Sequence, residues 1–138
     1  MADKVRLRLV TPNRVLLDED VDEVTVPGAW GELGILPDHI TFLTSLDIGA
    51  MSYKQGSQRI HIALSGGYAE VLNNVVTVLA GAAEFSREID VGRAQNAREK
   101  AEKKMEELNR EDEEFAVTES ALRRAATRLA VAAYEARK

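Results

Sequence analysis

The chain has 138 residues and no cysteine, which excludes disulfide bonds and metal sites built on thiolates. Aromatic residues are only 5% of the composition, so a hydrophobic core must be built mainly from Val, Leu, Ile and Ala. No apolar run reaches the roughly 18 residues of a membrane-spanning helix, and the N-terminus lacks the apolar core of a signal peptide. With 45% hydrophobic and 30% charged residues, we expect a folded protein of the cytoplasm.

A basic excess is also lacking. The net charge of −5 argues against a nucleic-acid-binding protein, since such proteins need basic surface to displace counterions. The acidic excess lies in residues 1–86, whereas residues 87–138 carry equal numbers of acidic and basic side chains. Glycine and proline end at nearly the same place, because all of them lie at or before Gly92. These residues form turns and break helices, so we predict two domains, 1–86 and 87–138.

The first domain shows the pattern of short strands. Apolar and polar residues alternate in VRLRLV, and further runs rich in β-branched residues are separated by polar turns. The predicted strands are 5–10, 21–27, 32–37, 48–53, 59–65, 68–72 and 75–80. Within GELGILPDH we expect a buried strand over 33–36, with turns at Gly31 and Pro37, and we interpret SGG at 65–67 as a tight connection. This spacing predicts an antiparallel β-sandwich or barrel.

The second domain shows the pattern of two helices. Apolar residues recur every three or four positions over 90–110, at Ala94, Ala97, Ala101, Met105 and Leu108. After the polar break NREDEE, a second stripe contains Phe115, Leu122, Ala125 or Ala126, Leu129, and Ala132 or Ala133. Asp90 is a candidate N-cap of the first helix. The complete prediction is an α+β chain, in which a β-sandwich precedes an antiparallel two-helix hairpin with an alanine-rich, weakly stabilising seam.

Signals for catalysis are weak. The opening glycines of GELGILPDH are not followed by GK[ST], and SGG does not have the spacing of a nucleophile elbow. His39 and His61 are the only histidines, and without cysteine or a ligand pattern we expect no metal site. His61 is interpreted as an outward-facing strand residue. Arg123, Arg124 and Arg128 leave two interpretations open: a solvated, salt-bridged face, or a surface for phosphates or an acidic partner.

Four segments are characteristic when taken together: GELGILPDH, TFLTSLDIGAMSY, IALSGGYAEVLNNVVTVLA and EIDVGRA. With them the chain resembles the epsilon subunit of F-type ATP synthases over about residues 4–135. The resemblance implies a non-catalytic subunit of the central rotor stalk that needs no cofactor. It implies partners as well: the gamma subunit, the ring of c subunits, and the beta and alpha subunits of the catalytic head. Membrane contact would then occur only through the complex, at the cytoplasmic face of the bacterial plasma membrane.

The resemblance also implies roles for particular residues. Glu32 and His39 would dock on the c-ring. The hairpin would lie folded on the sandwich, or extend into the head and inhibit ATP hydrolysis, with Arg123, Arg124 and Arg128 contacting beta. Some bacterial members bind ATP through the motif I/L-D-x-x-R-A, which stands here at 89–94. The candidate ATP ligands are Glu84, Asp90, Arg93, Lys100, Arg124 and Arg128.

Two departures affect the ATP site. Lys100 stands where ATP-binding members have an arginine, with Arg98 two residues earlier, and lysine is a point charge rather than a bidentate fork. Gly92 loosens the first helical turn by up to about 1 kcal/mol. Asp90 therefore remains open as an N-cap or an ATP ligand. The alternative function is an ATP-binding sensor module whose main role is ligand-gated conformational switching, whereas an enzyme would need a nucleophile and base that the sequence does not offer.

Overall fold

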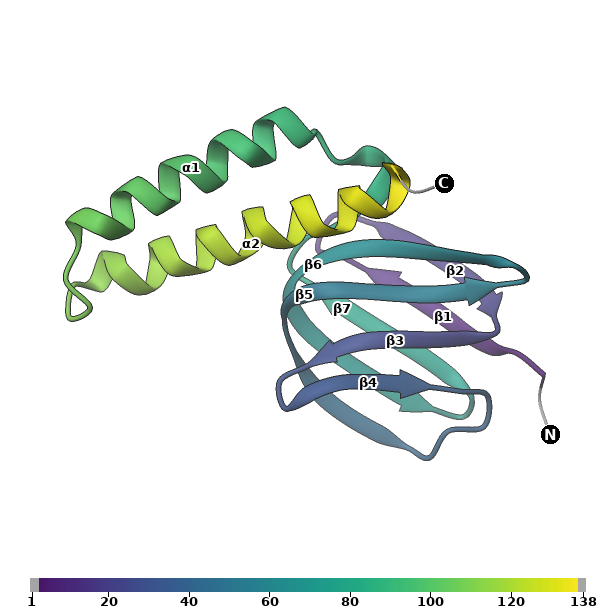
Figure 1. The fold of residues 1–138 in the computed structure, drawn as a ribbon. Helices are drawn as coiled ribbons and strands as arrows, with labels where there is room; N and C mark the ends of the chain where they lie inside the picture. The colour runs from purple at the N-terminus through teal and green to yellow at the C-terminus, as the bar shows by residue number, and fades with distance from the viewer. Residues whose placement is uncertain (1–2, 137–138) are drawn as a thin grey trace.

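The computed structural model describes residues 3–136 as a β-sandwich followed by two α-helices (Figure 1). The strands are β1 (Val5–Val10), β2 (Val15–Val21), β3 (Glu23–Gly28), β4 (Gly31–Ile35), β5 (Phe42–Gln55), β6 (Gln58–Leu72), β7 (Val75–Ala80) and β8 (Ala83–Phe85). A short 3-10 helix, η1 (Ser86–Glu88), leads into α1 (Val91–Glu107) and α2 (Glu113–Ala136). The predicted fold, a sandwich followed by a helical hairpin, is confirmed.

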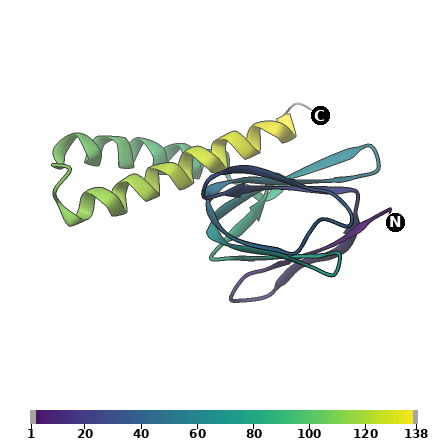
Figure 2. The same ribbon diagram turned by 90° about the horizontal axis from the view of Figure 1, so that it is seen from below.

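The strands are hydrogen-bonded in the order β2-β1-β7-β6-β5-β3-β4, and β8 pairs with β6. The long strands β5 and β6 curve so that they belong to both layers of the sandwich, which Figure 2 shows from below. The core between the layers is almost entirely aliphatic, as the composition predicted, and includes the fully buried Leu7, Met51 and Val76. One pairing differs from the predicted antiparallel arrangement, because β1 and β7 run parallel.

The interpretation of SGG as a connection between two strands is wrong. Gly66 and Gly67 lie inside β6, which is continuous from Gln58 to Leu72. On one side of these glycines β6 pairs with β7, and on the other side it pairs with β8. The strand bends at this point, with a φ of 144° at Gly67, and a Cβ there would lie 1.9 Å from the Leu79 carbonyl oxygen. A bend that needs glycine has the same sequence pattern as a turn.

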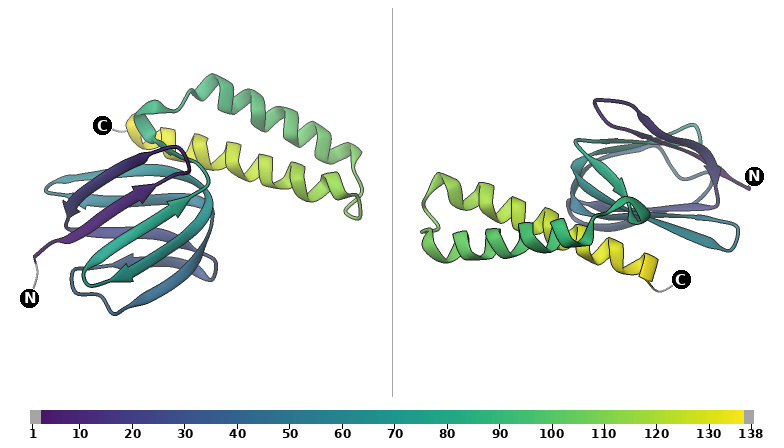
Figure 3. Two further views of the ribbon diagram at one scale, coloured as in Figure 1. Left: turned by 180° about the vertical axis from the view of Figure 1, so that it is seen from behind. Right: turned by 90° about the horizontal axis from the view of Figure 1, so that it is seen from above.

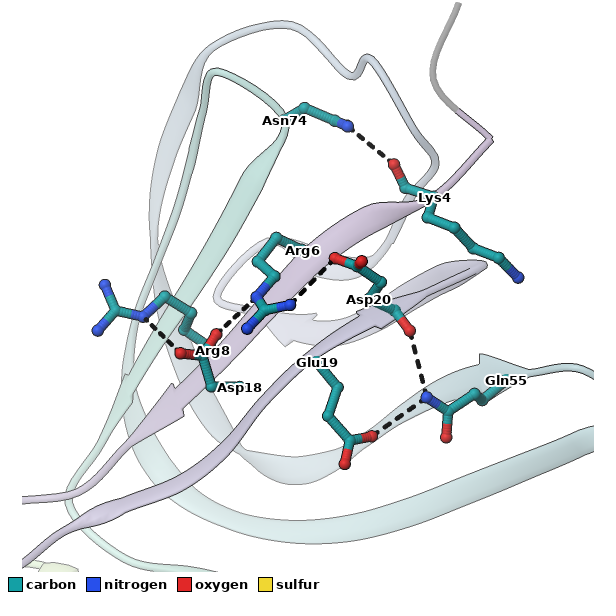
Figure 4. Close-up of polar contacts among 8 residues, drawn as sticks. All are labelled: Lys4, Arg6, Arg8, Asp18, Glu19, Asp20, Gln55 and Asn74. Atoms are coloured by element: carbon teal, nitrogen blue, oxygen red, sulfur yellow. Dashed lines mark hydrogen bonds and ion pairs between the residues drawn. The ribbon is translucent and has the colours of Figure 1, made fainter.

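Two strands were not predicted. β2 contains the acidic run Asp18 to Asp20. Acidic residues have low strand propensity, so the sequence did not predict this strand. Ion pairs across to β1 compensate: the Arg6 Nε lies 2.7 Å from Asp18 Oδ1, and the Arg6 Nη1 lies 3.3 Å from Asp20 Oδ1 (Figure 4). The predicted strand 21–27 in fact divides between the end of β2 and β3. β8 has only three residues, too few to show a periodicity.

The first helix, α1, begins and ends within about three residues of its predicted range, 90–110. Asp90 caps α1, since its Oδ1 accepts a hydrogen bond of 3.0 Å from the Arg93 backbone N–H. The predicted stripe of α1 is wrong at Ala97, which is exposed, because the buried face continues from Ala94 through the half-buried Arg98 to Ala101. In α2, the open choices are decided for Ala125 and Ala132, both buried, whereas Ala126 and Ala133 are exposed. The buried residues of α2 also include a polar one, Thr118.

The hairpin is folded against the sandwich, and α2 is the helix that makes the contact (Figure 3). The C-terminal part of α2 lies on β5 and β6, while the loop joining the two helices projects beyond the sandwich (Figure 1). A small cluster of buried apolar residues packs at this contact: Ala63, Ile89, Val131 and Ala132. His61 points out of the sandwich as predicted, but Tyr134 covers it. The two rings are stacked, with their centroids 3.6 Å apart and an angle of 3° between their planes.

The bend in β6 generates the first prediction. Gly67→Ala should destabilise the protein by about 1–3 kcal/mol or more, because the new methyl group meets a backbone carbonyl and alanine disfavours the positive φ. Gly34→Ala in β4 is the matched control, since a Cβ there meets nothing within 4 Å. Urea denaturation of both variants measures the difference. Equal stabilities would contradict the close approach of β6 and β7.

Candidate functional site

A pocket of about 440 Å³ lies between the sandwich and α2. Its floor is formed by β6 and by the segment that leads into β8, and α2 forms the opposite wall. Three arginines and two glutamates supply its charged groups: Arg14, Arg124, Arg128, Glu84 and Glu88. The volume is in the usual range for small-molecule sites, about 300–1,000 Å³. A mixture of alanine surface and arginines could bind a ligand with an apolar part and an anionic part.

An ion pair crosses this pocket and joins the two domains. Arg128 donates from Nε to Glu84 Oε1 at 2.8 Å and from Nη2 to Glu84 Oε2 at 3.4 Å, a bidentate arrangement. Both side chains are partly buried, with 25% of the Arg128 side chain and 32% of the Glu84 side chain exposed. Because charge-assisted bidentate pairs have a defined geometry, this contact helps to align α2 with β8.

The structure brings together three of the six candidate ATP ligands. Glu84, Arg124 and Arg128 line the pocket. Asp90, Arg93 and Lys100 do not line it, and the Asp90 carboxylate is occupied as the cap of α1. Sequence reasoning missed the pocket residues Arg14, Glu88 and Ser65. Arg14 lies in the turn between β1 and β2, about 110 positions before its arginine neighbours in the chain, so no local pattern could have linked them.

Arg123 lies on a different side of α2 and has a partner of its own. Its Nη2 is 2.7 Å from Asp47 Oδ1 on β5. The Arg123 guanidinium lowers the pKa of Asp47 below its ordinary value, and a hydrogen bond from the Ile48 backbone N–H lowers it further. The end of α2 is also fixed, because the Ser86 hydroxyl donates to Glu135 Oε1 at 2.8 Å. The docked hairpin is therefore held at several points along α2.

The predicted buried strand in GELGILPDH is wrong. The strand is β4, Gly31–Ile35, at the edge of the sheet, and only Ile35 is buried in it. Leu36 follows directly after the strand and is 58% exposed, because successive side chains of an extended chain point to opposite sides and the Ile35 side chain already points inward. Glu32 is exposed and lines a second pocket with Arg59, His61 and Tyr134.

His39 lies in the loop between β4 and β5, beyond the opposite end of β4 from Glu32. The His39 and Phe42 rings form an edge-to-face contact, with their centroids 6.2 Å apart. The His39 backbone N–H donates a hydrogen bond of 3.2 Å to the Leu36 carbonyl. The loop is fixed to the neighbouring β6–β7 turn by a 2.9 Å bond from the Asp38 N–H to Asn74 Oδ1.

Several large apolar side chains are exposed at this loop and in the adjoining strand ends: Leu36, Ile40, Leu43 and Leu72. Trp30, in the turn between β3 and β4, is 99% exposed. The four apolar side chains at and beside the β4–β5 loop form the kind of exposed apolar patch that is typical of a surface that contacts a partner. Across residues 3–136 we find no cluster of side chains suited to a metal ion and no helix long and apolar enough to cross a membrane.

The architecture of this chain is found in subunits of ATP synthases. In the structure of the Euglena gracilis mitochondrial ATP synthase (OSCP/F1/c-ring in rotational state 1), one chain matches it with a TM-score of 0.81 and 25% identity. The match covers 100% of this chain and 84% of that chain. The fold therefore places this chain in a class of proteins that are components of ATP synthases.

Sequence comparison is more specific. The family model described as ATP synthase, Delta/Epsilon chain, beta-sandwich domain matches residues 4–86, and the model of the family's long alpha-helix domain matches residues 87–133. The ATP synthase epsilon chains of Geotalea uraniireducens and Geobacter sulfurreducens are 49% and 48% identical over 138 residues, with both chains covered in full. The chain belongs to this family as an epsilon subunit, a component of an enzyme complex and not its catalytic subunit.

The contact between Arg123 and Asp47 generates a second prediction. Asp47→Asn should loosen the docked hairpin and speed hydrogen exchange of the α2 amides at pH 7, because the pair loses its negative charge. A carboxyl with a lowered folded pKa stabilises the docked form fully above pH about 4, and this contribution is lost as the pH falls through the lowered pKa. The difference between the variant and the unaltered chain should therefore disappear in acid.

Glu106→Gln, which removes an exposed carboxylate from α1, is the control for net charge. Hydrogen exchange read out by mass spectrometry separates α2 from the sandwich. Identical exchange of α2 in Asp47→Asn and in the unaltered chain at pH 7 would show that this ion pair does not hold the hairpin.

Proposed function

We propose that this epsilon subunit belongs to the central stalk, where it couples proton-driven rotation to ATP synthesis and inhibits ATP hydrolysis through its hairpin. The observation that supports this best is the pairing of α2 arginines with sandwich carboxylates, Arg123 with Asp47 and Arg128 with Glu84. In the docked hairpin these arginines are neutralised. If the hairpin is released, they become available to an acidic surface elsewhere, such as that of a beta subunit.

The docked state is held weakly enough to be released. Its apolar cluster contains two alanines, which bury little area at about 25 cal/mol per Å². The arginine pairs are partly exposed, and pairs of this kind contribute about 0–1 kcal/mol each. A ligand or partner can shift an equilibrium between two states only by its difference in affinity for them, so a small gap between docked and extended states suits a switch.

The sandwich would dock on the rest of the stalk through its fixed, exposed surfaces. We assign contact with the c-ring to Glu32 and His39, with the apolar side chains of the β4–β5 loop beside His39, and contact with gamma to the sandwich. Because Glu32 and His39 lie at opposite ends of β4, they would meet different parts of a partner surface. The subunit would be peripheral at the cytoplasmic face of the bacterial plasma membrane.

The pocket favours a second role, the sensing of ATP. Phosphates would compete with Glu84 for Arg128, and Arg124 would add a second guanidinium from the same face of α2. Once displaced from Arg128, the Glu84 carboxylate could accept hydrogen bonds from ribose or base. A ligand that contacts both α2 and β8 stabilises the docked hairpin, because it binds the extended form less well. In the alternative function, this ligand-gated switching is the main role of the chain.

The ATP site is tested by titration calorimetry of the isolated chain with ATP. Replacement of Arg124 and Arg128 by alanine should weaken binding at least about tenfold, since each charge-assisted contact contributes about 1.5–3 kcal/mol. Arg110→Ala, in the loop between α1 and α2, is the matched control. A double variant that binds ATP as tightly as the unaltered chain would eliminate this site.

The docking surface is tested by Glu32→Lys in the assembled ATP synthase. We expect lower proton-driven ATP synthesis with the fold intact, because Glu32 is exposed and the new charge is repelled where a carboxylate was accommodated. Glu106→Lys, on the exposed side of α1, is the matched control for the charge change. Normal synthesis by the Glu32 variant would show that β4 has only a structural role.

A further inference from the structure

Arg14 enters the pocket from the sandwich and not from the helices. It lies in the turn between β1 and β2, which is closed by two backbone hydrogen bonds between Thr11 and Arg14, of 3.0 and 3.3 Å. The Thr11 hydroxyl adds a third contact to the Arg14 carbonyl at 3.4 Å. The backbone of Arg14 is therefore held in place, so the starting point of its side chain is defined before any ligand binds.

The pocket arginines differ in their partners. Arg128 is bound to Glu84 in the docked hairpin, so an incoming anion must displace a carboxylate to reach it. The guanidinium of Arg14 makes no hydrogen bond or ion pair with the side chains and backbone of the part of the chain that the structure describes. An anion entering the pocket could therefore bind the Arg14 guanidinium on the sandwich side without displacing a carboxylate from it.

We propose that Arg14 is a third phosphate-binding arginine of this pocket, and that a bound polyphosphate joins the sandwich to α2. The inference deepens the proposed sensing of ATP and rests on it. Arginines on both walls, Arg14 on one and Arg124 and Arg128 on the other, suit a chain of phosphates that spans the space between them. AMP has one phosphate to offer to the arginines of the two walls, whereas ATP and triphosphate each have three. The site therefore distinguishes ATP from AMP, and the bound phosphates hold the hairpin down.

Calorimetric titration of the full chain at fixed ionic strength tests this with three probes: ATP, AMP and inorganic triphosphate. Arg14→Ala should weaken binding of ATP and of triphosphate about tenfold and leave AMP unchanged. Arg14→Lys should recover part of the loss, because it restores the charge but not the fork. Arg110→Ala, at the far end of the hairpin, should behave like the unaltered chain.

The outcomes separate this inference from the proposed ATP sensing. If Arg14→Ala binds ATP and triphosphate as tightly as the unaltered chain, the role of Arg14 is overturned and ATP sensing stands. If the unaltered chain binds triphosphate in an Arg14-dependent manner but not ATP, the phosphate site stands and ATP sensing is overturned. If the unaltered chain binds neither ATP nor triphosphate, both the role of Arg14 and the proposed ATP sensing are overturned. Equal loss of AMP and ATP in Arg14→Ala would also overturn the inference, since it would indicate a general disturbance of the pocket.

Discussion

The arrangement of this molecule depends on the close approach of β6 to β7 at Gly67. Because only hydrogen occupies the space facing the Leu79 carbonyl, β6 can bend there and pass from one layer of the sandwich to the other. On the N-terminal side of the bend, β6 pairs with β8 and presents Ala63 to α2. The same bend thus closes the sandwich, positions Glu84 on β8 and forms the floor of the pocket. A side chain at Gly67 would alter all three.

Much of the fold follows from periodicity. The alternation in 5–10 and 75–80 identified β1 and β7, and the loss of glycine and proline after Gly92 identified the helices. Local patterns failed where tertiary contacts override propensity. The acidic residues of β2 are accommodated only because Arg6 and Arg8 face them from β1, and no property of residues 15–21 alone reveals those partners. The interpretation of SGG was wrong for a different reason: a pair of glycines in the sequence is compatible both with a turn and with a bend inside a strand.

The candidate site was predictable in its charges and not in its geometry. Resemblance to the family selected Glu84, Arg124 and Arg128, and these do meet in one pocket. It also selected Asp90, for which the structure shows the simpler role of capping α1. Arg14 could not be found, because the β1–β2 turn comes next to α2 only after the entire sandwich has formed. Arg14 was missed because it is far from Arg124 and Arg128 in the sequence, although its side chain is of the same type.

The parallel pairing of β1 with β7 has a consequence for how the protein is made. Asn74 donates to the Lys4 carbonyl across 70 positions of the chain, and β1 has no inner neighbour until β7 exists. During synthesis from the N-terminus, β1 can therefore pair only with β2 until about nine-tenths of the first domain has been made and β7 is present. Long-range pairing of this kind is slow compared with helix formation. The hairpin, which is synthesised last, then docks on a surface that the completed sandwich has already formed.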